Sequence, residues 1–152
     1  MMPYKYYWED FQVGETVELG RHTVDREEVI AFAKQFDPQP FHVDEEAAKS
    51  SFYGGLIASG WHTCGIVMRM MCDAYLNQSA SLGSPGVDSV RWLLPVRPGD
   101  TLRATRTILE SRASSSKPNM GIVKNRWDVY NQKEEKVMTM EGYGLFARRP
   151  ST

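Results

Sequence analysis

Residues 59–76 read SGWHTCGIVMRMMCDAYL, and this segment determines what the rest of the chain has to provide. At helical spacing its apolar side chains lie on almost every side, and the charged residues are Arg69 and Asp73, four positions apart. A helix that is apolar nearly all round is buried rather than half exposed, so other elements must enclose it. Ser59 is suited to the N-cap position, which leaves the backbone N–H of Gly60 free in the first turn.

The sequence on either side supplies strands to enclose this helix. Alternation of apolar and polar residues, the period of a half-buried strand, predicts strands over residues 16–23, 90–96, 101–110, 123–129 and 136–147, with a polar loop at 111–118. A curved antiparallel sheet of about five strands wrapped around one long buried helix is the α+β architecture called the hotdog fold. We expect a single domain over residues 1–152, with an irregular arm at 1–14 and a tail at 148–152.

Two further helices are expected before the buried one. Asp25 and Glu28 have the spacing of a capping box, and apolar residues from Val29 to Phe36 follow at helical spacing, which predicts a helix over 26–36 with one buried face. Residues 44–49 have acids first and a lysine last, which favours a short helix.

Between these helices, Pro38 and Pro40 restrict the backbone. Each proline fixes its own φ and disfavours the α region for the preceding residue. We therefore expect residues 37–44, DPQPFHVD, to form a stiff non-helical loop with Asp37 and His42 near its two ends. An acid and a base on a rigid loop are suited to proton transfer, although an isolated pair of this kind is more often structural.

Composition narrows the functional classes. The net charge of −1 gives no basic field for nucleic acid or for an anionic membrane, and no apolar run is long enough for a membrane span. The aromatic N-terminal residues do not resemble a signal peptide. Cys64 and Cys72 fall on one predicted helix, eight residues apart, so they cannot form a disulfide with each other. These features favour a cytoplasmic protein.

The loop and its surroundings resemble the MaoC-like acyl dehydratases, a hotdog family related to the (R)-specific enoyl-CoA hydratases. The family motif of an aspartate, an Asn-Pro pair, a histidine and a second acid is matched by residues 37–44. Residues 55–60, GLIASG, resemble the family's approach to its central helix, and residues 90–100 resemble its strand with a Pro-x-x-x-Gly-Asp turn. Three positions depart from the pattern. Gln39 stands where the family usually has asparagine, Ser59 where many members have histidine, and Met68 where the hydratases have a serine.

The resemblance implies hydration of a trans-2-enoyl-CoA to an (R)-3-hydroxyacyl-CoA. Asp37 and His42 would hold a water between them, and the Gly60 N–H would bind the thioester oxygen. We expect Phe36 and Phe41 to shield Asp37 and raise the pKa of its carboxyl. The implied partners are an acyl-CoA substrate and a second copy of the chain, with no cofactor other than the CoA of the substrate and no metal. The residues expected to contact substrate are Gln39, Phe41, Ser59 and Trp61.

Other interpretations remain open. Hotdog proteins also include acyl-CoA thioesterases, which would need a carboxylate beside the central helix, and a non-catalytic acyl-CoA-binding protein is compatible with the missing serine. A metal site is disfavoured because His62, Cys64 and Cys72 lack the usual paired ligand spacing. Basic strand residues are either contacts for CoA phosphates or simply solvated: Arg91, Arg97, Lys124 and Arg126.

Overall fold

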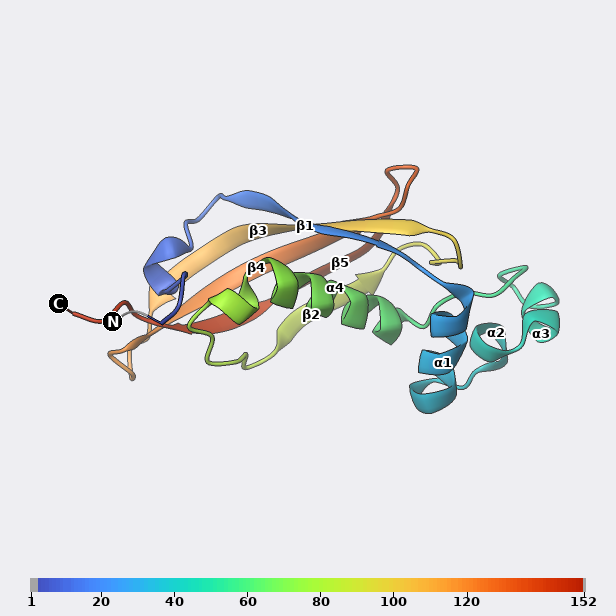
Figure 1. Cartoon of the computed structure of the whole chain (residues 1–152), viewed down its shortest axis with the longest axis horizontal. Helices are drawn as coiled ribbons and strands as arrows, with labels where there is room; N and C mark the ends of the chain where they lie inside the picture. The colour runs from blue at the N-terminus through green and yellow to red at the C-terminus, as the bar shows by residue number, and fades with distance from the viewer. Residues whose placement is uncertain (1–2, 152) are drawn as a thin grey trace.

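The computed structural model describes residues 3–151, so the extreme ends of the expected arm and tail, at 1–2 and 152, lie outside the described residues. Within this range, one antiparallel sheet has the strand order β1-β3-β4-β5-β2. Its strands are β1 (Thr16–Thr23), β2 (Val87–Trp92), β3 (Thr101–Ala113), β4 (Met120–Tyr130) and β5 (Lys136–Ala147). The hotdog architecture is confirmed: the long helix α4 (Gly60–Ala74) lies across one face of this sheet (Figure 1).

The core lies between α4 and the sheet. Val67 and Met71 of α4 are 0% and 2% exposed, and they belong to the same apolar cluster as the inward-facing strand residues such as Leu102 and Val129. The expectation of a helix enclosed on all sides overstated its burial, because Trp61 and Met68 are 60% and 49% exposed. One side of α4 therefore remains open. No helix in residues 3–151 is long and apolar enough to cross a membrane.

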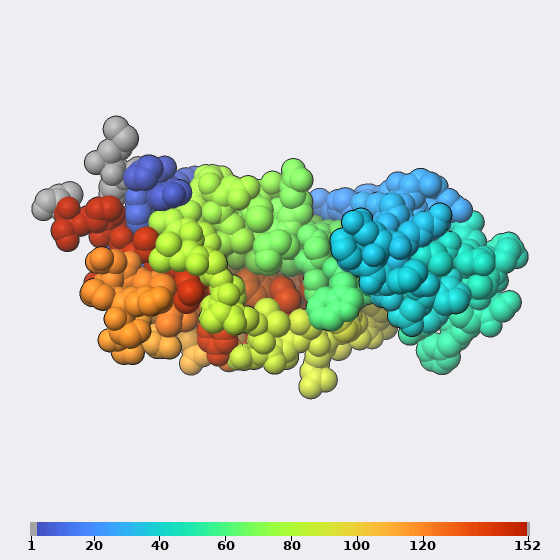
Figure 2. Space-filling model, turned by 90° about the horizontal axis from the view of Figure 1, so that it is seen from below, coloured from blue at the N-terminus to red at the C-terminus, as the bar shows by residue number. Residues whose placement is uncertain are grey.

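Three short helices gather where α4 begins, at the opposite end of the molecule from the chain termini (Figure 1). They are α1 (Arg26–Phe36), α2 (Pro40–Val43) and α3 (Glu45–Lys49), and they form a distinct lobe at one end of the surface in Figure 2. Helix α2 corrects the expectation of a non-helical loop. Pro40 stands at the first helical position, where a missing N–H costs nothing and the fixed φ already suits a helix. Phe36 is also 66% exposed rather than buried.

Several other boundaries differ from the expectations. Strand β2 ends at Trp92, because the backbone N–H groups of Leu93 and Leu94 both turn to the carbonyl of Val137. Strand β3 continues to Ala113, which shortens the polar loop. The N-terminal arm contains a 3₁₀ helix, η1 (Trp8–Asp10), and Phe11 is part of the core. A second 3₁₀ helix, η2 (Leu76–Gln78), follows α4.

Candidate active site

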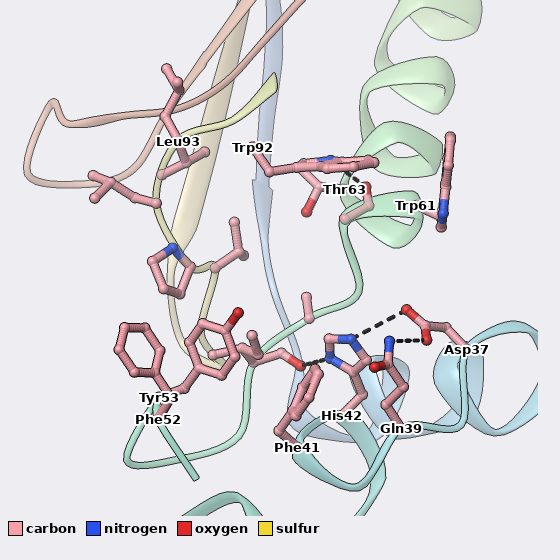
Figure 3. Close-up of a pocket in the computed structure, with 17 residues that line it drawn as sticks. Asp37, Gln39, Phe41, His42, Phe52, Tyr53, Trp61, Thr63, Trp92 and Leu93 are labelled. Carbon is pink, nitrogen blue, oxygen red and sulfur yellow. Dashed lines mark hydrogen bonds and ion pairs between the residues drawn. The ribbon is translucent and has the colours of Figure 1, made fainter. Parts of the chain in front are cut away.

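Asp37, His42 and Gly60 line one pocket of about 510 Å³, which opens beside the start of α4 (Figure 3). Asp37 is the C-cap of α1, His42 lies on the single turn of α2, and Gly60 is the first residue of α4. The sequence predicted these three as the catalytic groups, and the fold brings them together from three separate elements. Their catalytic role stays a prediction at this point.

The acid and the base are in direct contact. Oδ2 of Asp37 lies 3.2 Å from Nε2 of His42, and the two side chains are 18% and 5% exposed. Nδ1 of His42 lies 2.7 Å from the carbonyl oxygen of Ile57. A carbonyl can only accept, so Nδ1 carries a proton, and Nε2 is the ring nitrogen that faces Asp37. The two groups therefore touch directly, and the single water that they are expected to hold stays a prediction.

Two donors from the protein occupy the Asp37 carboxylate. Nε2 of Gln39 donates to Oδ1 at 2.7 Å, and Oγ of Ser59 donates to Oδ2 at 2.7 Å. Burial alone raises the pKa of the Asp37 carboxyl, but the hydrogen bonds from Gln39 and Ser59 and the neighbouring His42 together outweigh it and lower the pKa. The predicted rise was wrong because these donors, rather than apolar shielding, dominate the surroundings of the carboxylate.

The backbone N–H of Gly60 points to no acceptor among residues 3–151, as expected for the first turn of a helix. Ser59 is the N-cap predicted from the sequence, and its Oγ accepts the N–H of Trp61 at 3.3 Å. On the other side, the indole of Trp92 donates from Nε1 to the Gly60 carbonyl at 3.0 Å. A free N–H at a helix N-terminus attracts negative charge, so this turn is a suitable oxyanion site.

The remaining expected contacts divide into two groups. Gln39, Phe41 and Trp61 line the pocket, and their contact with substrate stays a prediction. Ser59 does not: its side chain is fully buried behind Asp37, so a direct substrate contact is not available to it.

The basic residues considered as contacts for CoA phosphates also differ in their surroundings. Arg97 donates to the carbonyl of Tyr53, a pocket residue, at 2.7 Å. Lys124 and Arg126 are instead committed to ion pairs with Asp88 and Asp128.

The sequence did not single out the apolar walls of the pocket. The chain after β2 supplies Leu93, Leu94 and Pro95, and the aromatic side chains come from Phe52, Tyr53 and Trp92. The available signal was the cluster of large apolar residues directly before a turn, which was interpreted only as a strand. Within residues 3–151, no group of His, Cys, Asp and Glu is arranged to hold a metal ion, and Cys64 and Cys72 are both free thiols.

This chain belongs to the MaoC like domain family, whose sequence profile matches residues 10–130. Among solved structures, it is similar to a MaoC-like dehydratase from Rhodospirillum rubrum, with a TM-score of 0.87, 41% identity, and 95% of this chain and 99% of that chain covered. It is 29% identical over 133 residues to YdeM, an uncharacterized protein of Bacillus subtilis, covering 88% of this chain and 93% of YdeM.

A third relative is the (R)-specific enoyl-CoA hydratase of Rhodospirillum rubrum, which is 29% identical over 108 residues, covering 68% of this chain and 69% of the hydratase. The family expected from the motif is thus confirmed. Two of these three relatives are named for dehydratase or hydratase activity, which supports a protein of the hydro-lyase kind.

Proposed function

We propose that this protein reversibly adds water to a trans-2-enoyl-CoA and produces a (R)-3-hydroxyacyl-CoA. The observation that carries the proposal is the Asp37–His42 contact of 3.2 Å, in a pocket that is also lined by the first turn of α4. The similarity to an enoyl-CoA hydratase supports the choice of substrate.

His42 is the base in this mechanism. Its protonated Nδ1 is held by the Ile57 carbonyl, so Nε2, which lies beside Asp37, is the nitrogen that would take a proton from water. The hydroxide adds to the β carbon while Nε2 becomes protonated, and the neighbouring Asp37 carboxylate stabilises the imidazolium. Nε2 then returns its proton to the α carbon, so that both parts of the water molecule end on the substrate.

Between these two steps, the electron pair of the double bond resides on the thioester oxygen. The Gly60 N–H would donate to this oxygen, and the helix dipole adds to the stabilisation. One donor of this kind is typically worth roughly 3 kcal/mol in the transition state. The apolar walls around the pocket would bind the acyl chain and exclude bulk water.

The test is the loss of enoyl absorbance on incubation with trans-2-enoyl-CoAs of increasing length, followed by chiral analysis of the product. We expect Asp37→Asn and His42→Ala each to lower kcat/KM by about 10²–10⁴-fold, the usual contribution of general acid–base catalysis. The matched controls are Asp73→Asn and His22→Ala, because Asp73 and His22 pair with Arg69 and Glu28 and do not line the pocket. A folded Asp37→Asn variant with normal turnover would refute the mechanism.

A thioesterase is the second candidate, and one observation favours it. The Asp37 carboxylate accepts a hydrogen bond from the N-cap residue of α4, so a carboxylate does stand beside the central helix. Release of free CoA thiol from a saturated acyl-CoA, with no change in enoyl absorbance, would support hydrolysis over hydration. Tight binding of acyl-CoA with neither reaction would support a non-catalytic protein.

A homodimer is also part of the proposal. Exposed apolar side chains surround the pocket mouth: Phe52, Trp61, Trp92, Leu93 and Leu94. Apolar surface that gathers in one place is typical of an interface, and β2 is an edge strand of the sheet. Sedimentation equilibrium would give the mass in solution, and a monomer at micromolar concentration would argue against the dimer.

A further inference from the structure

Ser59 connects the two halves of the proposed site. Its side chain is 0% exposed and lies between the Asp37 carboxylate and the first turn of α4. Oγ of Ser59 is 2.7 Å from Oδ2 of Asp37 and 3.3 Å from the backbone nitrogen of Trp61. One buried hydroxyl therefore contacts both the acidic residue and the helix end that carries the free Gly60 N–H.

The directions of these bonds depend on the charge of Asp37. A carboxylate can only accept, and a backbone N–H can only donate, so the Ser59 hydroxyl donates to Asp37 and accepts from Trp61. A protonated Oδ2 is a weaker acceptor than a carboxylate oxygen, so a proton there would weaken the bond from this completely buried hydroxyl. Hydrogen bonds to a charged group are the stronger ones, so the arrangement favours an ionised Asp37 over a neutral one. The second donor, Gln39, makes the same demand on Oδ1.

We propose that Ser59 is a positioning residue that keeps Asp37 ionised and fixes it to the first turn of α4. The catalytic part of this inference rests on the proposed hydration, whereas the coupling between Ser59 and Asp37 is independent of it. Of the three side chains that contact the carboxylate, His42 is titratable, and Gln39 and Ser59 are neutral donors. An anionic Asp37 leaves His42 as the group that carries the proton during turnover.

The coupling has a consequence for the geometry of catalysis. The carboxylate that stabilises the protonated base and the N–H that binds the thioester oxygen act on opposite ends of the reacting group. Because Ser59 contacts both Asp37 and the first turn of α4, it fixes their placement relative to each other.

The direct test is a titration of the Asp37 carboxyl by NMR with ¹³C-labelled aspartate, assigned by comparison with Asp37→Asn. We expect Ser59→Ala to raise the pKa of Asp37 by about one pH unit, as expected for loss of a hydrogen bond to a charged group, and to lower kcat at a pH where Asp37 is still ionised. The matched control is Ser79→Ala, which removes a buried hydroxyl that donates to the Tyr75 carbonyl at 2.6 Å, far along the chain from Asp37. We expect neither the Asp37 titration nor kcat to change in this control.

An Asp37 titration that is the same in Ser59→Ala and in the wild type would overturn the proposal. Ser59→Cys is the second variant, since it keeps the volume near that of serine but is a weaker donor, and it should give a smaller shift in the same direction. If the protein has no hydratase activity, the NMR titration still decides whether Ser59 holds Asp37 ionised. If activity is present and the NMR titration shifts while kcat does not fall, the coupling exists but the catalytic positioning is refuted.

Discussion

The contact between Gly60 and Trp92 makes a sharp prediction about the first turn of α4. A Cβ atom built on Gly60 would lie 2.3 Å from Cε2 of the Trp92 indole, and two further ring atoms would be within 2.7 Å. Gly60 has ordinary helical geometry, so the glycine is required by the space that the indole occupies rather than by its backbone conformation. Gly60→Ala should therefore displace either the ring or the turn.

The size of the effect follows from these distances. The ring must retreat by about 1 Å to reach ordinary van der Waals contact at 3.4 Å, which also breaks the 3.0 Å bond from Nε1 to the Gly60 carbonyl. Overpacking of this kind typically costs about 1–3 kcal/mol, and the lost hydrogen bond about 1 kcal/mol. A displacement of about 1 Å in a catalytic group can lower turnover by about 10²-fold.

Thermal unfolding and the enoyl-CoA assay together test this prediction. The matched control is Gly65→Ala on the same helix, where nothing lies within 4 Å of the new Cβ, and there the variant should be neutral or more stable by up to about 1 kcal/mol. Adding Trp92→Ala to Gly60→Ala should recover part of the lost stability, because the obstruction is gone. If Gly60→Ala has an unchanged Tm and full turnover, the indole does not define this turn and the reasoning fails.

Two further predictions concern buried groups away from the pocket. Burial lowers the pKa of His62 in the folded protein, and the nearby Glu28 only partly opposes this effect. As the pH falls below about 6.5, His62 therefore binds a proton in the unfolded chain before it does so in the folded protein. Stability should therefore fall as the pH drops from about 6.5, and His62→Phe, which keeps a ring stacked on Phe32, should lose much of this fall in urea unfolding. Arg106 is 4% exposed and donates to Glu15 at 2.9 Å, so Glu15→Ala should lower the free energy of unfolding by about 2 kcal/mol; no change in denaturant midpoint would contradict this.

Elements specified by local patterns were predicted well from the sequence. The helix at 26–36 and the strands at 16–23 and 136–147 have the expected bounds; a capping box marks the helix, and the alternation that indicates a strand is weak over 16–23. The sequence also identified Ser59 as an N-cap, which depends on its immediate neighbours. Helix α2 was missed because the backbone restriction that proline imposes on its preceding residue was extended to the whole loop. Pro40 instead begins a helical turn.

The electrostatics of the site could not be predicted in this way. The direction of the pKa shift of Asp37 depends on a hydrogen bond from Ser59, which is 22 positions away. The first turn of α4 at Gly60 is held by a hydrogen bond from Trp92, which is 32 positions away. Neither contact leaves a periodic signal in the sequence. Only the fold shows that a residue expected to contact substrate stands behind the carboxylate, and that a residue counted as part of a strand covers the glycine.

The first turn of α4 is held on one side by its serine cap and on the other by an indole, and both contacts come from the protein itself. Donors fixed in this manner need little reorganisation when charge develops beside them, which is the main source of electrostatic catalysis. Active sites often weaken the protein that carries them. Here the same contacts would serve folding and catalysis. Variants that loosen this turn to admit bulkier ligands should therefore have both a lower Tm and a lower turnover rate.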